Sequence, residues 1–335
     1  MADRAAQKTA FLRNAGWGDA TAEKLAGDAS DRSYLRLRLG GQSRVLMDSP
    51  PGKGDDPADF SFFARHLRGL GLSAPEVLAA DFSAGFLLLE DLGDGLLGRC
   101  IAENPKLDLP LYALATDVLL HLQAQPLPPK IQNLSAGDWA EAAMLVLDWY
   151  RFAITGDRLD SGPLCQTLTR LLKTHADGTR VLILRDYHAE NLLFLPDRPG
   201  LARLGLLDFQ LAQSGQPGYD LVSLLQDARR EVPQALEEAM IARFVQNCAA
   251  PAGFRQSYAV LGVQRALRIL GIFARLCLVA GKPGYLPLIP RVWGHLQRNL
   301  STPGLEDFSG LCREQLPEPT AENLARIGSQ CAAFR

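Results

Sequence analysis

The chain has 335 residues, which is enough to bury one large hydrophobic core or two modest ones. Its 47% hydrophobic and 21% charged residues are ordinary for a globular protein. The formal net charge is −2, so the composition excludes bulk electrostatic attraction to nucleic acid or to a membrane surface.

Neither a targeting segment nor a membrane segment is expected. The first residues carry charges throughout and have no long apolar core, unlike a signal peptide. The most apolar stretch, residues 267–280, is interrupted by Arg268 and Arg275. We therefore expect a cytoplasmic protein with no nucleic-acid, membrane or obligate protein partner.

The N-terminal residues predict a short helix followed by a meander of strands. Apolar residues at helical spacing place the helix at residues 4–15. Three short runs separated by Gly, Asp and Ser predict strands near residues 23–27, 33–39 and 44–48. The first turn contains Ser30 and is a candidate cover for phosphate, because small residues let backbone N–H groups approach an anion and Arg32 adds charge. An ordinary hairpin turn would also explain these residues.

The pattern then changes from strands to helices. A helix is predicted at residues 58–70, and two further strands at residues 74–81 and 85–90. Leucine and valine residues recur at 3.6-residue spacing from residue 109 to 122, which indicates a helix facing the core. Two more helices are predicted at residues 136–157 and 161–175.

Residues 181–210 carry the chemistry. Three short apolar runs bounded by polar, Pro or Gly residues predict a strand, a loop, a second strand, a turn and a third strand. Asp186 and Asn191 lie in the loop, and Asp208 follows the third strand. One acid that can take a proton, with an amide and a second acid that can hold Mg²⁺, is the set of groups used in phosphoryl transfer. A plain hairpin with a polar loop would leave this combination unexplained.

These residues resemble those of a known family. Arg185-Asp186, Asn191 and Asp208-Phe209-Gln210 match the catalytic and metal loops of kinase-fold enzymes. Gly218-Tyr219-Asp220-Leu221 resembles the continuation in aminoglycoside and choline phosphotransferases. Within that superfamily, the chain is most similar to the bacterial N-acetylmuramate/N-acetylglucosamine anomeric kinases. The segments that carry this closer resemblance are Gly27–Ser30, Val45–Pro51, Leu88–Asp94 and Gly281–Pro283.

The resemblance implies an α+β, protein-kinase-like fold with two lobes. A small antiparallel-sheet lobe at residues 1–92 would bind the nucleotide. A large, mainly helical lobe at residues 93–335 would hold the catalytic and substrate-binding groups. ATP and Mg²⁺ are the implied cofactors, with the adenine held by backbone groups of Glu90 and Leu92.

The same resemblance assigns the three polar residues of the 181–210 stretch. Asp186 would orient the acceptor hydroxyl and take its proton, and Asn191 and Asp208 would hold Mg²⁺. The expected activity is transfer of phosphate to the anomeric hydroxyl of N-acetylmuramate or N-acetylglucosamine.

The chain departs from the protein-kinase pattern on its third strand. Kinases place a phosphate-binding lysine there, paired with a helix glutamate. This strand offers Met47 and Asp48, and the following helix contains no glutamate. Arg32, Arg36 or Lys53 could supply the missing charge.

The acceptor is predicted to be small and not cationic. The connection from Asp208 to Asp220 is too short for the activation loop of a protein kinase. Residues 251–300 contain seven Lys or Arg residues and no Asp or Glu. A polycationic aminoglycoside needs the opposite charge, whereas a carboxylate such as the lactyl group of N-acetylmuramate suits arginine. The candidate substrate-binding residues are Arg268, Arg275 and Arg291.

Two alternatives remain. The first is a kinase for an aminoglycoside or another small alcohol. A choline-type kinase would be one such enzyme, but it would need an aromatic or acidic cage for the quaternary ammonium group. The second is a catalytically idle nucleotide-binding scaffold, which the absent strand lysine and Leu184, in place of the histidine of many kinases, would favour. The intact set of base and metal ligands favours an enzyme.

Overall fold

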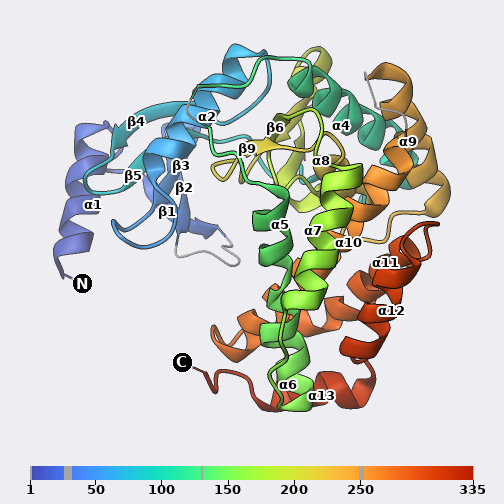
Figure 1. Ribbon diagram of the computed structural model, residues 1–335. Helices are drawn as coiled ribbons and strands as arrows, with labels where there is room; N and C mark the ends of the chain where they lie inside the picture. The colour runs from blue at the N-terminus through green and yellow to red at the C-terminus, as the bar shows by residue number, and fades with distance from the viewer. Residues whose placement is uncertain (1, 26–31, 130, 249–252, 335) are drawn as a thin grey trace. The chain divides into compact units, whose positions relative to one another are not determined.

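The computed structural model describes residues 2–25, 32–129, 131–248 and 253–334 (Figure 1). The chain forms two compact units, one made of Met1–Val118 with Leu184–Ala212, the other of Leu119–Ile183 with Gln213–Arg335. We call them unit 1 and unit 2. The division does not follow the predicted lobe boundary at residue 92, because the segment 184–212 packs with the N-terminal part of the chain. The lobe boundary itself stays a prediction.

Unit 1 is built on an antiparallel sheet of five strands in the order β1-β2-β3-β5-β4. The strands are β1 (Thr21–Leu25), β2 (Ser33–Leu39), β3 (Gln42–Asp48), β4 (Val77–Asp81) and β5 (Phe86–Glu90). The predicted meander and the two later strands are therefore confirmed. Residues 26–31, including Ser30 and the predicted phosphate cover, lie outside the described part of the chain.

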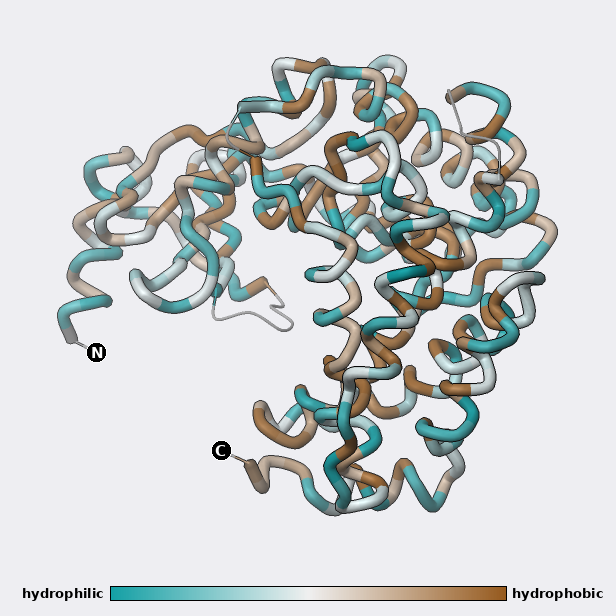
Figure 2. Tube along the Cα trace, viewed as in Figure 1, coloured by the Kyte–Doolittle hydropathy of each residue, from teal (hydrophilic) through white to brown (hydrophobic). Residues whose placement is uncertain are grey.

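Unit 1 also contains helices, before, within and after the sheet in the sequence. They are α1 (Ala2–Asn14), α2 (Pro57–Gly69), α3 (Leu97–Glu103), the 3₁₀ turn η1 (Pro105–Leu107) and α4 (Asp108–Gln123), whose last turns belong to unit 2. Hydrophobic and hydrophilic stretches follow one another closely along the helical parts of both units (Figure 2).

Alternating apolar residues of the sheet form the core of unit 1. Leu37, Leu46, Phe86 and Leu88 are at most 2% exposed. Phe11 of α1 stacks on Phe86 with ring centroids 5.6 Å apart. The helix predicted at residues 4–15 therefore covers the sheet through its apolar side.

A β-hairpin carries the segment predicted to hold the catalytic groups. Strands β7 (Leu192–Phe194) and β8 (Leu204–Leu206) pair antiparallel, and the 3₁₀ turns η3 (Ala189–Asn191) and η4 (Gly200–Arg203) precede them. The first predicted strand, β6 (Val181–Ile183), does not join this hairpin. It pairs with β9 (Gln213–Gly215), a strand that the sequence analysis missed.

Unit 2 is mainly helical. Its elements are α5 (Ala136–Ala143), the π-helix η2 (Val146–Arg151), α6 (Phe152–Thr155), α7 (Gly162–His175), α8 (Tyr219–Leu225), α9 (Gln234–Asn247), α10 (Phe254–Leu278), η5 (Pro283–Leu288), α11 (Ile289–Leu300), α12 (Glu306–Gln315) and α13 (Ala321–Ser329). The single helix predicted at residues 136–157 was wrong, since a π-helical stretch interrupts it. Among the helices described, none is both long and apolar enough to cross a membrane.

Gly271 lets α10 approach the π-helical region closely. A Cβ atom built on Gly271 would lie 2.2 Å from the backbone carbon of Leu145. Backbone atoms cannot move aside as a flexible side chain can, so this position requires glycine.

We predict that Gly271→Ala destabilises unit 2 although alanine favours helices. The helix-propensity gain of roughly 1 kcal/mol is outweighed by overpacking against the Leu145 backbone, which typically costs about 1–3 kcal/mol. The matched control is Gly294→Ala on α11, where nothing lies within 4 Å of the added atom and a gain in stability is expected. Urea unfolding of both variants measures the difference, and equal stabilities would contradict the close packing.

Candidate active site

The loop that carries Asp186 turns sharply after β6. Arg185 adopts a left-handed backbone conformation with φ 73°, which is uncommon for a residue other than glycine. The Asp186 N–H donates to the Leu184 carbonyl (3.0 Å). The Tyr187 hydroxyl donates to the Ala115 carbonyl of α4 (2.8 Å) and anchors the loop. Backbone strain of this kind persists where the surroundings enforce it, and it is frequent at functional sites.

Asn191 closes the loop onto Asp186. Its Nδ2 donates to the Asp186 carbonyl (2.9 Å), and its backbone N–H donates to the His188 carbonyl (2.9 Å). Its own carbonyl accepts from the Leu207 N–H (2.9 Å), which ties the loop to the end of β8. Because Nδ2 is used inside the loop, Oδ1 is the side-chain atom of Asn191 that can serve as a ligand.

Asp208 is the second residue after β8. Its φ is 55°, again in the left-handed region. Its Oδ1 accepts from Arg32 (2.7 Å) and from Gln210 Nε2 (3.0 Å). Phe209 is fully buried and packs against Phe60 of α2, with ring centroids 4.9 Å apart. The buried phenylalanine therefore fixes the backbone between Asp208 and Gln210. The Asp208 side chain is 37% exposed.

Of the three candidates for the missing lysine, only Arg32 contacts a predicted site residue. Its side chain is 6% exposed and pairs with Asp208 at 2.7 Å and with Asp55 at 3.5 Å. Burial disfavours its charge, but Tyr34, Asp208 and Asp55 outweigh burial and raise the pKa of the guanidinium above its ordinary value. Lys53, in contrast, is exposed.

Arg36 has a different task. It forms ion pairs with Asp91 (2.8 Å) and Asp94 (2.8 Å), the residues that follow β5. Asp91 also accepts from the Gly93 N–H (3.0 Å). Burial raises the pKa of Asp91, but Arg36 and Gly93 outweigh it and hold that pKa below its ordinary value. Arg36 thus fixes the segment that follows β5, through contacts that the sequence analysis missed.

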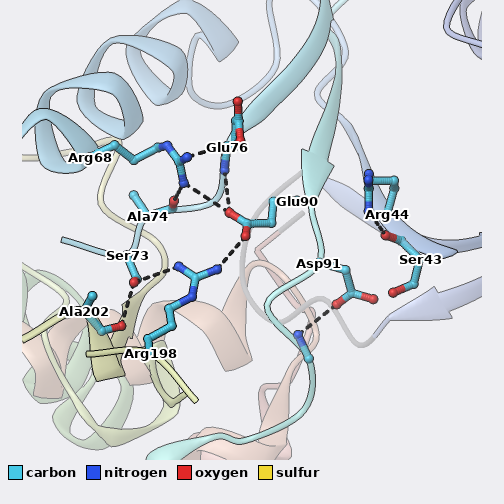
Figure 3. A network of polar contacts seen from close by, with 11 residues as sticks. Ser43, Arg44, Arg68, Ser73, Ala74, Glu76, Glu90, Asp91, Arg198 and Ala202 are labelled. Atoms are coloured by element: carbon cyan, nitrogen blue, oxygen red, sulfur yellow. Dashed lines mark hydrogen bonds and ion pairs between the residues drawn. The ribbon is translucent and has the colours of Figure 1, made fainter. Parts of the chain in front are cut away.

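Glu90, predicted to contact adenine through its backbone, lies in a polar network. Figure 3 shows its carboxylate between the guanidinium groups of Arg68 (3.2 Å) and Arg198. Its backbone N–H donates to the Glu76 carbonyl (2.8 Å), so its carbonyl is the backbone group left for adenine. Leu92, the other residue predicted to contact adenine, is half-buried.

The three arginines predicted to bind substrate lie on two helices of unit 2. Arg268 and Arg275 belong to α10, where Arg268 is half-buried and the Arg275 guanidinium lies 5.9 Å from the Trp149 ring centroid. Arg291 of α11 donates to the Ala228 carbonyl (3.0 Å). Arg275 and Arg291 therefore both have contacts inside unit 2.

The basic region at residues 251–300 is less positive in the structure than in the sequence. Arg255 pairs with Glu238 (2.7 Å), and Arg298 pairs with Glu237 (2.7 Å). Both acids lie on α9, just before the acid-free segment. Counting charges in a sequence window cannot detect this neutralisation.

The oxygen atoms of unit 1 suit a hard cation. Asp208 keeps a second carboxylate oxygen beside the one held by Arg32 and Gln210, and Asn191 keeps its Oδ1. Mg²⁺ prefers such ligands and is commonly bound by one or two side chains together with phosphates and water. No group of three or more His, Cys, Asp or Glu residues that could hold a metal ion occurs in the described part of the chain.

Comparison with known proteins identifies the family of the chain. Residues 21–255 match the model of the phosphotransferase enzyme family. An N-acetylmuramate/N-acetylglucosamine kinase of Caulobacter vibrioides is 37% identical over 95% of this chain and 98% of the relative. A kinase of the same name from Pseudomonas aeruginosa is 32% identical over 84% of this chain and 85% of its own length.

Solved structures show the fold. A choline/ethanolamine kinase family protein from Mesorhizobium loti aligns over 97% of this chain and 99% of its own, with a TM-score of 0.62 at 17% identity. A choline kinase from Streptococcus pneumoniae aligns over 90% and 99%, with a TM-score of 0.60 at 15% identity. The predicted kinase-like α+β fold is confirmed, and the chain belongs to the phosphotransferase enzyme family.

Proposed function

We propose that this phosphotransferase moves the γ-phosphoryl group of ATP to the anomeric hydroxyl of N-acetylmuramate or N-acetylglucosamine. The observation that carries the proposal is the closed loop in which Asn191 holds the Asp186 carbonyl, with Asp208 at the end of the adjoining strand. The names of relatives that match nearly the full length of the chain support the acceptor.

Asp186 acts as the base. Its carboxylate orients the acceptor hydroxyl and takes its proton as the oxygen attacks phosphorus. The carboxylate is half-exposed, and its backbone is fixed on both sides by the turn and by Asn191. Little covalent chemistry is required of the protein, so positioning the two reactants supplies most of the rate.

Asn191 and Asp208 would hold Mg²⁺, which neutralises charge on the phosphates when bound. Arg32 orients Asp208 from the side and brings a permanent positive charge to this position. We assign Arg32 the phosphate contact that the third strand lacks, because it is the candidate that contacts Asp208. Adenine is assigned to the Glu90 carbonyl and the Leu92 N–H.

The first functional prediction concerns the base. Asp186→Asn should lower kcat by about 10²–10⁴-fold, since a positioned base typically contributes that much. ATP affinity and thermal stability should stay near wild type, because Asn191 is held by the backbone carbonyl of residue 186 and not by its side chain. Asp197→Asn, an exposed change in the turn of the same hairpin, is the control and should be silent. Wild-type turnover in Asp186→Asn would refute the assignment.

The second prediction separates the three candidate cations. Arg32→Ala should raise the KM for ATP and lower kcat, since a phosphate contact that persists in the transition state affects both. Lys53→Ala should change neither constant, because Lys53 is exposed and outside this network. Arg36→Ala should lower stability, because it leaves the buried Asp91 carboxylate without its cation. Steady-state kinetics with ATP as the varied substrate, together with melting curves, measure all three effects. Unchanged ATP kinetics in Arg32→Ala would leave phosphate anchoring to backbone amides.

The third prediction concerns the acceptor. Arg268→Gln, Arg275→Gln and Arg291→Gln are compared with both sugars, and we expect at least one to lower kcat/KM more for N-acetylmuramate. A charge-assisted contact to the lactyl carboxylate is worth about 1.5–3 kcal/mol, which N-acetylglucosamine cannot lose. Arg275 is the first choice.

Arg255→Gln is the control for that comparison, because its guanidinium pairs with Glu238 on the surface. Equal losses on both sugars would mean that the three arginines only shape unit 2. Turnover of an aminoglycoside such as kanamycin, without turnover of either sugar, would overturn the acceptor assignment.

A further inference from the structure

Four polar side chains of unit 1 form a closed ring of contacts at the candidate site. Arg32 Nη2 lies 2.7 Å from Asp208 Oδ1 and 3.5 Å from Asp55 Oδ2. Gln210 Nε2 donates to the same two oxygen atoms, each at 3.0 Å. One guanidinium nitrogen and one amide nitrogen thus bridge the same two carboxylates. We call these four residues, Arg32, Asp55, Asp208 and Gln210, the Arg32 ring.

The backbone of Asp55 is fixed by contacts outside the ring. Its carbonyl accepts from the Ser49 hydroxyl (3.0 Å), and the Ser49 N–H donates to the Gly85 carbonyl (2.8 Å). The next residue, Asp56, caps α2, because its carboxylate accepts from the Ala58 N–H (2.8 Å). Asp55 therefore lies between an anchored turn and the first turn of α2, and its carboxylate is presented from a defined place.

The opposite side of the ring is tied to the same helix. Phe209, between Asp208 and Gln210, packs against Phe60 of α2. The ring is also largely covered, since the side chain of Arg32 is 6% exposed and that of Asp55 is 23% exposed. Contacts between charged groups are stronger and less screened where water is excluded, so this ring differs from an ion pair on the surface.

The ring contains both members of a pair that the sequence lacks at its usual place. In protein kinases, the strand lysine that contacts the phosphates is paired with a glutamate of the following helix. Here that strand offers Met47 and Asp48, and α2 contains no glutamate. Arg32 instead immediately precedes β2, and Asp55 lies two residues before α2. A cation and its acidic partner are thus present in unit 1, but they come from other positions in the chain.

Gln210 makes the ring more than a simple ion pair. Protein kinases have a glycine here, in Asp-Phe-Gly, and glycine has no side chain that could reach a second acid. An amide nitrogen can donate two hydrogen bonds, and Gln210 Nε2 donates one to each carboxylate. Two carboxylates close together repel each other, and donors between them offset that repulsion. Gln210 therefore lets Asp55 and Asp208 share Arg32.

We propose that Asp55 is a positioning residue for Arg32 and that Gln210 holds Asp55 in this role. The inference rests on the proposed function, which gives Arg32 the contact with the phosphates of ATP. An arginine side chain loses much rotamer freedom when it is fixed. Asp55 fixes Arg32 before the nucleotide arrives, so less entropy is lost when the phosphates bind.

The test is a double-mutant cycle on the affinity for a non-hydrolysable ATP analogue, measured by calorimetry with Mg²⁺ present. Asp55→Asn keeps the shape of the side chain and removes its charge. It should weaken binding of the analogue about 10-fold, as the loss of a residue that orients a binding group commonly does. In an Arg32→Ala background, the same change should alter the affinity less than about twofold, because no guanidinium remains to be positioned.

A second variant tests the other half of the inference. Gln210→Met removes the amide donors at similar volume and should also weaken binding of the analogue. Combined with Asp55→Asn, it should cost less than the product of the two single effects, because both changes act through one ring. Melting curves of the nucleotide-free variants separate the roles, since a purely structural role lowers stability and leaves the affinity of the folded protein unchanged.

The matched control is Asp59→Asn, which removes an exposed carboxylate in the first turn of α2 and should leave the affinity unchanged. The inference is overturned if Asp59→Asn weakens binding as much as Asp55→Asn does. It is also overturned if Asp55→Asn binds as wild type does, or costs as much in the Arg32→Ala background as in wild type. The proposed function survives these results as long as Arg32→Ala itself weakens binding. If Arg32→Ala binds the analogue as wild type does, the assigned phosphate contact fails and this inference fails with it.

Discussion

The hydrogen bond from the Asn191 amide to the Asp186 carbonyl is the contact on which the candidate site depends. It closes a loop that begins with a left-handed Arg185, and it fixes which oxygen of Asn191 remains as a ligand. The Asn191 carbonyl in turn binds the Leu207 N–H, next to Asp208. The predicted base and the predicted metal ligands are thus linked through backbone groups of the loop and of the residue after β8.

Charge is supplied to this site in an unusual way. The strand that carries a lysine in protein kinases has Met47 and Asp48 here, and Arg32 at the start of the neighbouring strand β2 contacts Asp208 instead. Arg36, four residues further along the chain and within β2, forms ion pairs with Asp91 and Asp94 after β5. Arg32 and Arg36 are buried to a similar extent, but they pair with different acids.

The region predicted to bind the acceptor carries less net positive charge than its sequence suggests. The run of residues 251–300 contains no acid, but α9 supplies Glu237 and Glu238 to its arginines. The net charge of a sequence window is therefore a poor guide to the charge that an acceptor would meet, because ion pairs with residues outside the window neutralise it.

The sequence by itself predicts the strands of unit 1 and of the hairpin, which the structure confirms, and it predicts Asp186 as the base and Asn191 and Asp208 as metal ligands. Short apolar runs bounded by turn residues are local signals, and Asp186, Asn191 and Asp208 are defined by their spacing. Tertiary structure alone decided the rest. Strand β6 pairs with β9, Arg32 pairs with Asp208, and Arg36 pairs with Asp91, and each of these contacts joins residues distant in the chain. Such contacts form only when elements pack, so no local pattern of residues encodes them.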